Sequence, residues 1–139
     1  TARDVFAAAG YAGDALDTIL GVSYMEADGP ACTDRFGVRS AYADAVGDLV
    51  LIDDKYGPSI GLTQVRSLRD PHAWGTADRW RVARLLQVTA FNAEAAWWIS
   101  KQGSDFTPWT MFRNQFYLPH KGLDFEVRTG HVRAGEWNA

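Results

Sequence analysis

Apolar residues recur at helical spacing near the start of the chain. An alanine-rich segment, residues 3–9, predicts a first helix that stops at Gly10. Asp14 is an N-cap type of residue, so a second helix is expected to begin there. This helix should end near Ala27, because Gly29-Pro30 cannot continue it. Two helices are therefore predicted within the first 27 residues.

The second half of the chain again shows helical spacing. Residues 76–87 carry apolar side chains on one stripe, which predicts a third helix. Thr89 is expected to cap the next helix and Gly103 to stop it. Pro108 suits the first turn of a short helix that runs through Asn114.

The pattern between these helices is different, because glycines and aspartates surround a short apolar run at residues 49–52. Such a run predicts one strand or a small hairpin, placed at about residues 45–60. The tail from Val127 has no regular pattern and is expected to be irregular. The predicted fold class is mainly α, with a small β-hairpin or loop region.

Composition narrows the class of protein further. A chain of 139 residues with 47% apolar residues is expected to fold as one domain, residues 1–139, and its start at Thr1 suggests a piece excised from a larger protein. A net charge of -3 with both signs interspersed argues against a nucleic-acid partner. No apolar run approaches the roughly 18 residues of a membrane span, so no membrane partner is expected either.

Metal and cofactor chemistry have little support in the sequence. A single cysteine, Cys32, excludes an intrachain disulfide and a thiolate zinc site. The histidines, His72, His120 and His131, do not form an H-E-x-x-H helix. We therefore expect no metal and no cofactor.

The segment Gly57-Pro58-Ser59-Ile60-Gly61 fits the G-x-S-x-G pattern of a hydrolase nucleophile elbow. That elbow needs a strand before it, a helix after it and a parallel sheet around it. The chain shows no alternation of strands and helices, and Pro58 fixes the backbone where the strained turn would form. Ser59 is therefore interpreted as a turn or cap residue.

Glu26 is the strongest candidate for an acid catalyst. It falls in the last turn of a predicted helix, where the helix dipole opposes a negative charge. Its neighbours Val22, Tyr24 and Met25 are largely apolar, and an apolar surround also raises the pKa of a carboxyl group. A glycosidase acid must be protonated at its working pH, so these features favour that chemistry.

Three segments together resemble the motifs of lytic transglycosylases and goose-type lysozymes: Glu26 at a helix end, the turn Gly61-Leu62-Thr63-Gln64 and the segment Phe91-Asn92-Ala93. More closely, YGPSIGLTQVRSL, FNAEAAWWIS and DFTPWTMFRNQFYL resemble lysozyme-like domains of actinobacterial phage lysins and tail proteins. The resemblance covers about residues 15–118. It departs from the family where Ala27 follows the catalytic Glu in place of Ser.

The resemblance implies a lysozyme-like fold and cleavage of the β-1,4 bond between N-acetylmuramic acid and N-acetylglucosamine in peptidoglycan. Glu26 would be the general acid and then, as its conjugate base, would activate the muramoyl 6-hydroxyl in a lytic transglycosylase or water in a hydrolytic muramidase. Asp54 matches a water-orienting Asp of goose-type lysozymes. The place of action would be the bacterial cell wall, reached by a phage endolysin or a virion-associated lysin.

The resemblance also implies residues that bind the glycan strand. Gly61 suits a turn whose backbone approaches the sugar closely, and Gln64 offers a donor and an acceptor. The other candidates for substrate contact are Ser59, Phe91, Asn92, Trp98, Trp109 and Tyr117.

Two other classes of function remain open. A glycan-binding module without catalysis would use the six Trp and five Tyr to stack on sugar faces. A cell-wall peptidase or amidase would need zinc ligands or a Cys-His pair, and Cys32 has no evident partner. The protein is expected to act as a monomer.

Overall fold

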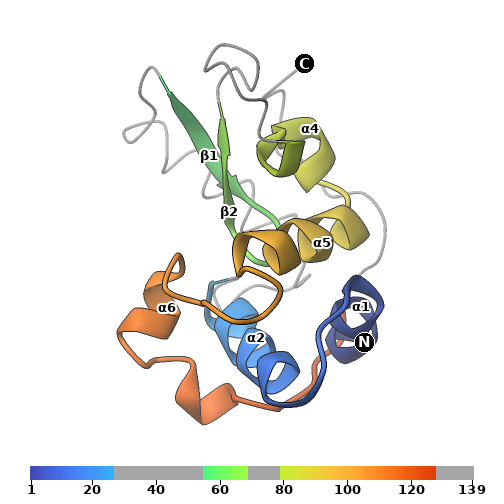
Figure 1. Cartoon of the computed structure of the whole chain (residues 1–139), viewed down its shortest axis with the longest axis vertical. Coiled ribbons are helices and arrows are strands. Elements are labelled where there is room, and N and C mark those ends of the chain that lie inside the picture. The colour runs from blue at the N-terminus through green and yellow to red at the C-terminus, as the bar shows by residue number, and fades with distance from the viewer. Residues whose placement is uncertain (27–54, 69–78, 128–139) are drawn as a thin grey trace.

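A computed structural model describes residues 1–26, 55–68 and 79–127. Their elements, in chain order, are α1 (Ala2–Ala9), α2 (Gly13–Glu26), β1 (Tyr56–Ile60), β2 (Val65–Leu68), η3 (Arg79–Arg81), α4 (Ala83–Leu86), α5 (Thr89–Ile99), α6 (Thr110–Arg113) and η4 (Leu118–His120), where η is a 3-10 helix. The prediction of a mainly α fold with a small hairpin is confirmed (Figure 1). None of the described helices is long and apolar enough to cross a membrane.

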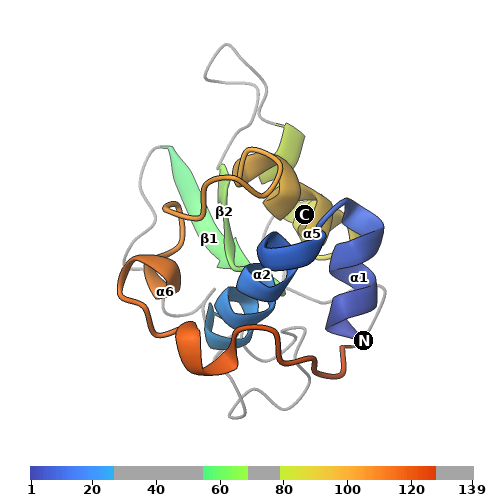
Figure 2. The ribbon, with the colours of Figure 1, turned by 60° about the horizontal axis from the view of Figure 1, so that its bottom comes forward.

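The elements gather at two ends of the molecule, with α5 between them (Figure 1). One end holds the hairpin and α4, and the other holds α1, α2 and α6. Helix α5 packs against α1 on one side and against α4 and η3 on the other. Helix α2 lies between α1 and α6, as Figure 2 also shows.

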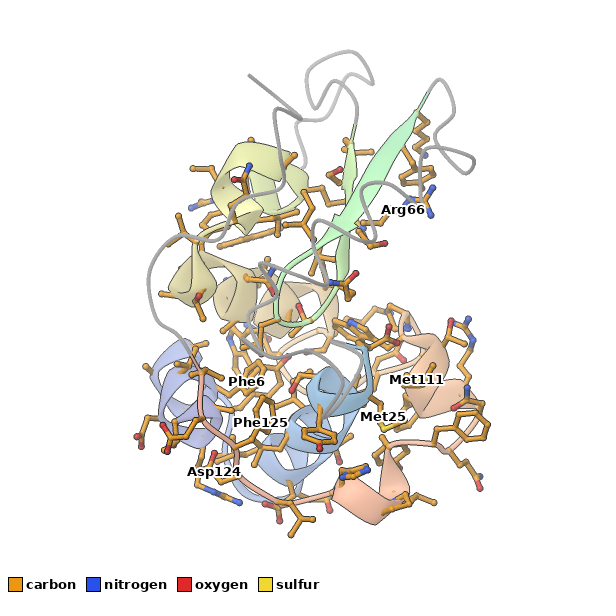
Figure 3. All side chains as sticks on the ribbon, turned by 180° about the vertical axis from the view of Figure 1, so that it is seen from behind. Phe6, Met25, Arg66, Met111, Asp124 and Phe125 are labelled. Carbon is orange, nitrogen blue, oxygen red and sulfur yellow. The ribbon has the colours of Figure 1, made fainter. Side chains whose placement is uncertain are left out.

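Two apolar clusters match these two ends. The larger contains Phe6, Leu20 and Leu62, and the smaller contains Ile60 and Val65. Figure 3 shows side chains filling the space between α1, α2 and the chain after α6. Leu62 belongs to the first cluster while its neighbours in the hairpin belong to the second. Burial of both sides therefore fixes the β1–β2 turn at the junction of the two ends.

The first two helices agree closely with the pattern of the sequence. Thr1 caps α1 in a capping box with Asp4, and Gly10, at a φ of 128°, ends the helix. Helix α2 begins at Gly13, so Asp14 lies in its first turn and is not the N-cap that we expected. A carboxylate at either position is favoured by the positive end of the helix dipole, which explains the small error.

The helix expected at residues 76–87 is interrupted. Val82 has extended backbone angles, φ −82° and ψ 112°, and forms a parallel bridge with Leu68. The 3-10 turn η3 and the short α4 stand on either side of it. Pairing with the end of β2 therefore overrides the helical periodicity here, while residues 76–78 lie outside the described part of the chain.

The last helices differ from expectation only at their ends. Thr89 is the first residue of α5 and is buried, and Val88 occupies the N-cap. The helix ends at Ile99, and the chain then passes through left-handed backbone to Gly103, at a φ of 81°. Helix α6 ends at Arg113, one residue before the predicted end at Asn114, and begins at Thr110, beyond Pro108.

The hairpin lies later in the sequence than expected. Its antiparallel strands pair Ser59 with Arg66 and Ile60 with Val65, so residues 61–64 form the turn. Ser59 is a strand residue, and its interpretation as a turn or cap residue is wrong. The chain also leaves this strand into an antiparallel partner, which is not the strand-turn-helix order of a nucleophile elbow. The apolar run at residues 49–52 lies outside the described residues.

Candidate active site

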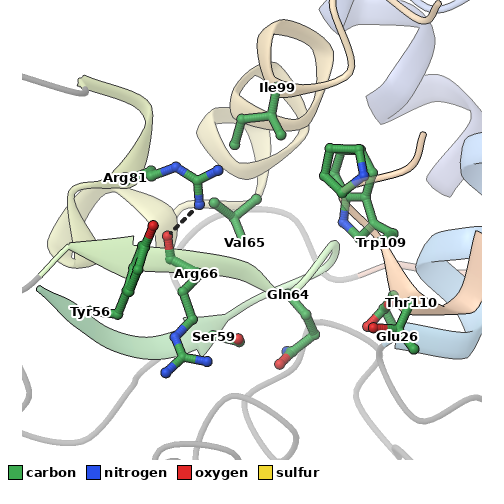
Figure 4. A pocket seen from close by; sticks show the side chains of 11 residues that line it. Glu26, Tyr56, Ser59, Gln64, Val65, Arg66, Arg81, Ile99, Trp109 and Thr110 are labelled. Atoms are coloured by element: carbon green, nitrogen blue, oxygen red, sulfur yellow. Dashed lines mark hydrogen bonds between the residues drawn. The ribbon is translucent and has the colours of Figure 1, made fainter. Parts of the chain in front are cut away.

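A pocket of about 710 Å³ lies where the end of α2, the hairpin and the start of α6 meet (Figure 4). Its described lining is Glu26, Tyr56, Ser59, Gln64, Val65, Arg66, Arg81, Ile99, Pro108, Trp109 and Thr110. In Figure 4, Glu26, Trp109 and Thr110 lie on one side, and the residues of the hairpin lie on the other. A chain-like ligand could therefore contact both ends of the molecule at once.

Glu26 is half-buried, and its Oε1 accepts a hydrogen bond from the backbone N–H of Met111 at 3.1 Å. Burial raises the pKa of its carboxyl group, while the Met111 N–H and the charge of Arg113 oppose that rise. The pKa remains above its ordinary value, because removal from water penalises the charged form more than these two contacts favour it. The Glu26 carboxyl group is therefore hydrogen-bonded to α6, and it binds its proton more tightly than an exposed carboxyl group does.

The turn at residues 61–64 has a backbone that few residues tolerate. Gly61 has a φ of 78°, and a Cβ atom there would collide with the amide nitrogen of Asn92. Gln64 is also left-handed, at a φ of 53°, although it is not glycine. Its backbone N–H and its side-chain Nε2 both donate to the carbonyl of Gly61, at 3.1 and 2.9 Å. The Gln64 side chain therefore closes its own turn.

Asn92 is fully buried beneath this turn and uses all of its hydrogen-bonding capacity to hold it. Its Oδ1 accepts from the backbone N–H and the hydroxyl of Thr63, at 2.9 and 2.6 Å. Its Nδ2 donates to the carbonyls of Ile60 and Leu86, at 2.8 and 3.0 Å. Asn92 therefore supports the turn from behind, and Thr63 faces Asn92 with a side chain that is fully buried.

Trp109 connects the turn to helix α6, whose backbone donates a hydrogen bond to Glu26. Its indole Nε1 donates to the carbonyl of Thr63 at 2.7 Å, and its side chain is almost fully buried. Trp109 is also the N-cap residue of α6, whose first turn supplies the Met111 N–H to Glu26. One side chain thus connects the two walls of the pocket.

Gln64 has one polar atom left for a ligand. Its Oε1 is buried, and the described part of the chain supplies no hydrogen-bond donor to it. A buried acceptor without a donor costs free energy, typically about 1–3 kcal/mol, and a ligand N–H would remove that cost. Gln64 lines the same pocket as Glu26, so this acceptor lies beside the candidate acid.

The structure brings some of the predicted site residues together and sets others apart. Glu26, Ser59, Gln64 and Trp109 line the pocket. Gly61 and Asn92 form and support the turn.

Three predicted aromatic contacts are outside the described lining. Phe91 packs beside Trp80 at 5.5 Å between ring centroids, and Tyr117 stacks on Phe112 at 5.1 Å. Trp98 is 45% exposed on α5. The roles of these aromatic residues in binding stay predictions, as does that of Asp54, which lies outside the described residues.

Sequence reasoning missed the arginine side of the pocket. Arg66 lies over the ring of Tyr56, 5.6 Å from its centroid, and Arg81 donates from Nη1 to the carbonyl of Arg66 at 2.9 Å. In the hairpin Arg66 pairs with Ser59, which also lines the pocket, but no strand was predicted at residues 65–68 and this pairing was therefore missed. Nothing in the pattern indicated Arg81, because tertiary folding alone brings η3 beside β2.

A comparison with protein families identifies the class. The model of a lysozyme-like domain family matches residues 3–111, which include α1, α2, the hairpin, α5 and the start of α6. The chain therefore belongs to the lysozyme-like domain family, and membership indicates a glycosidase-type enzyme that acts on peptidoglycan. No curated protein sequence and no solved structure matches the chain. Among the described residues, no group of three or more His, Cys, Asp or Glu could hold a metal ion.

Proposed function

We propose that this protein cleaves the β-1,4 bond between N-acetylmuramic acid and N-acetylglucosamine as a lytic transglycosylase, with Glu26 as general acid and then general base. The observation that carries this proposal is the half-buried Glu26 carboxyl group with its raised pKa, which lines a pocket opposite a turn with a free amide acceptor. A protonated acid in such a position can protonate the leaving glycosidic oxygen.

The reaction needs two proton transfers through one residue. Glu26 donates its proton to the bridging oxygen, the bond from muramoyl C1 to that oxygen breaks, and the N-acetylglucosamine 4-hydroxyl leaves. The resulting carboxylate then removes the proton of the muramoyl 6-hydroxyl, whose oxygen bonds to C1. The product is a 1,6-anhydro sugar, and Glu26 has regained its proton, so no water is consumed.

The described lining of the pocket supplies the one carboxylate that a transglycosylase needs. An inverting hydrolase uses a second carboxylate roughly 6.5–9.5 Å from the acid, whereas a transglycosylase needs only the acid. Glu26 is the only carboxylate among the described residues that line the pocket. Hydrolytic cleavage as a muramidase remains the second candidate function, because the proposed water-orienting residue, Asp54, lies outside the described ranges.

Mass spectrometry of digested peptidoglycan tests the proposal. Muropeptides lighter by one water than the hydrolytic products are expected, because the 6-hydroxyl replaces water as the nucleophile. Glu26→Gln keeps the shape of the side chain and removes the acid proton, so activity should fall by at least about 10²-fold. Near-normal activity in Glu26→Gln would overturn the assignment of the acid.

Asp54→Asn separates the two outcomes. If hydrolysis dominates and Asp54 orients the water, the substitution should slow hydrolysis by about tenfold or more while any anhydro product persists. If the wild-type product is entirely anhydro-sugar and Asp54→Asn has no effect, Glu26 works without a second carboxylate.

The two other classes of function have their own tests. A non-catalytic glycan-binding module would bind walls without clearing a wall suspension, in the wild type as in Glu26→Gln. A peptidase or amidase would release amino groups from digested wall, whereas the proposed enzyme releases anhydro-sugar ends. The place of action would be the bacterial cell wall, and a phage lysin or virion-associated lysin is the proposed setting.

A further inference from the structure

Two tryptophans stack on each other outside the described lining of the pocket, and Trp98 is the more exposed of the two. The rings of Trp80 and Trp98 lie within 17° of parallel, with centroids 6.0 Å apart. Trp98 is a large aromatic residue that is 45% exposed, on the same side of α5 as the exposed residues Ala90 and Glu94. We call the pair Trp80 and Trp98 the aromatic shelf. Phe91 packs beside Trp80 and supports the shelf from within the smaller apolar cluster.

The shelf adjoins the pocket through both of its elements. Trp80 precedes Arg81 in η3, and Trp98 precedes Ile99 in α5. Arg81 and Ile99 both line the pocket, where Figure 4 shows them on the side of Val65. Successive residues of a helix point about 100° apart, so the Trp98 side chain lies beside the part of the pocket wall that Ile99 forms and not inside the pocket. A long ligand that leaves the pocket past these two residues would meet the shelf.

The charge beside the shelf indicates which ligand it suits. The exposed guanidinium group of Arg79 lies over the ring of Trp80, 4.5 Å from its centroid. No acidic side chain in the described part of the chain forms an ion pair with Arg79. This positive group disfavours cationic ligands on the shelf and favours a ligand that carries a carboxylate.

We propose that the aromatic shelf is a second binding site for the peptidoglycan glycan strand, outside the cleavage pocket, and that Arg79 binds a carboxylate of that strand. The apolar face of a sugar ring would lie on Trp98, since aromatic rings offer large flat surfaces that lose little conformational entropy on binding. The carboxylate comes from the lactyl group of N-acetylmuramic acid or from its stem peptide. This inference rests on the proposed function, since it assumes that the pocket takes the same strand.

Binding to glycan strands without cleavage tests the shelf. In the Glu26→Gln protein, Trp98→Ala is expected to weaken the Kd for long, peptide-free glycan strands by roughly three- to tenfold, the usual range for one aromatic contact. The loss should be larger for long strands than for short oligomers that fill the pocket alone. Phe116→Ala is the matched control, because Phe116 is also an exposed aromatic residue, at 57%, and lies in neither site. It should bind as the parent does.

Arg79→Glu tests the charge without removing an aromatic ring. It should weaken binding of peptide-free strands, which keep the lactyl carboxylate, and should leave neutral N-acetylglucosamine oligomers unaffected. A loss that appears only with peptide-bearing strands would assign the carboxylate to the stem peptide.

Several results would overturn the proposal that the aromatic shelf binds the glycan strand. These are unchanged binding of long strands in both Trp98→Ala and Arg79→Glu, equal losses on long and short ligands, or an equal loss in Phe116→Ala. Failure of the proposed function is read separately, from the cleavage products of the wild-type protein. If the wild type cleaves glycan strands while the Glu26→Gln parent and its Trp98→Ala derivative bind them equally well, only the shelf is wrong.

Discussion

The indole N–H of Trp109 donates a 2.7 Å hydrogen bond to the carbonyl of Thr63, and this bond joins the hairpin turn to the start of helix α6. The turn presents Gln64 to the pocket, and the first turn of α6 presents the Met111 N–H to the acid. This buried hydrogen bond therefore contributes, together with the burial of Leu62, to the separation of Gln64 from Glu26.

Trp109→Phe is predicted to lower activity per folded molecule as well as stability. The substitution leaves the Thr63 carbonyl buried without a donor, at a cost of about 1–3 kcal/mol. Because small displacements of reacting groups cost up to about 10²-fold in rate, kcat should fall by roughly tenfold or more. Thermal unfolding and kinetics on glycan strands measure the two effects.

Tyr11→Phe is the matched control for Trp109→Phe. It removes a buried hydroxyl group that is 2.9 Å from the Ser100 Oγ, and Tyr11 does not line the pocket. It should lower stability and leave activity per folded molecule at the wild-type level. If the two variants show the same specific activity, Trp109 has only a structural role.

Asn92→Ala is predicted to destabilise the protein strongly. The substitution removes four hydrogen bonds and leaves the Thr63 N–H and two carbonyls without partners in a buried site. Each such orphaned group costs about 1–3 kcal/mol, so a loss of several kcal/mol in the free energy of unfolding is expected. Denaturant unfolding measures it, with Asn114→Ala at an exposed position as the control. A change within about 0.5 kcal/mol would exclude Asn92 as the support of the turn.

Gln64→Gly should reduce turnover without unfolding the protein. It removes the Nε2 hydrogen bond to the Gly61 carbonyl, which lowers stability, and relieves the left-handed backbone that Gln64 adopts, which raises stability, so these two effects oppose each other. The variant also lacks the Oε1 acceptor for substrate. A lost hydrogen bond to substrate of about 1–3 kcal/mol corresponds to roughly five- to 150-fold in rate. Gln64→Ala should lose similar activity and be the less stable of the two. Normal specific activity in both variants would contradict a role in substrate positioning.

The sequence predicted those parts of the fold that local chemistry controls. Gly10 and Gly103 lie where the chain leaves a helix through left-handed backbone, and Glu26 lies at the described end of α2, as its spacing indicated. The interruption of the expected helix at residues 76–87 could not be predicted from local chemistry. Val82 lies within the predicted helix but pairs with Leu68, and that partner is remote in sequence.

The candidate site was predictable only in part, for the same reason. Asn92 stood out because of the motif that contains it, but the motif did not distinguish a sugar ligand from a support of the turn. Three of its four buried hydrogen bonds go to the hairpin and the fourth goes to Leu86, so they come from two separate segments. Adjacent residues of a helix point about 100° apart, so Trp97 and Trp98 cannot face the same way. Packing of Trp97 against Tyr11, at 4.9 Å between centroids, determined that Trp98 became the exposed one.

The pH dependence of stability provides a test of Glu26 that needs no substrate. Burial raises the pKa of Glu26 in the folded protein above its ordinary value of 4.5, so the folded state holds this proton more tightly than the unfolded chain does. The stability that this proton contributes is present below pH 4.5 and is lost as pH rises through the folded-state pKa. Glu26→Gln cannot lose it, so the melting temperature of the variant should rise relative to wild type as pH increases across that window. The cleavage rate of the wild type should fall at the same upper pKa, since the acid form is required.

Asp105→Asn is the control of opposite sign, because hydrogen bonds from Thr107 lower the pKa of Asp105. Wild type should lose stability relative to Asp105→Asn as pH falls through that lowered pKa. A melting difference between wild type and Glu26→Gln that stays constant with pH would show that the carboxyl group is not perturbed, and the case for Glu26 as a protonated acid would fail.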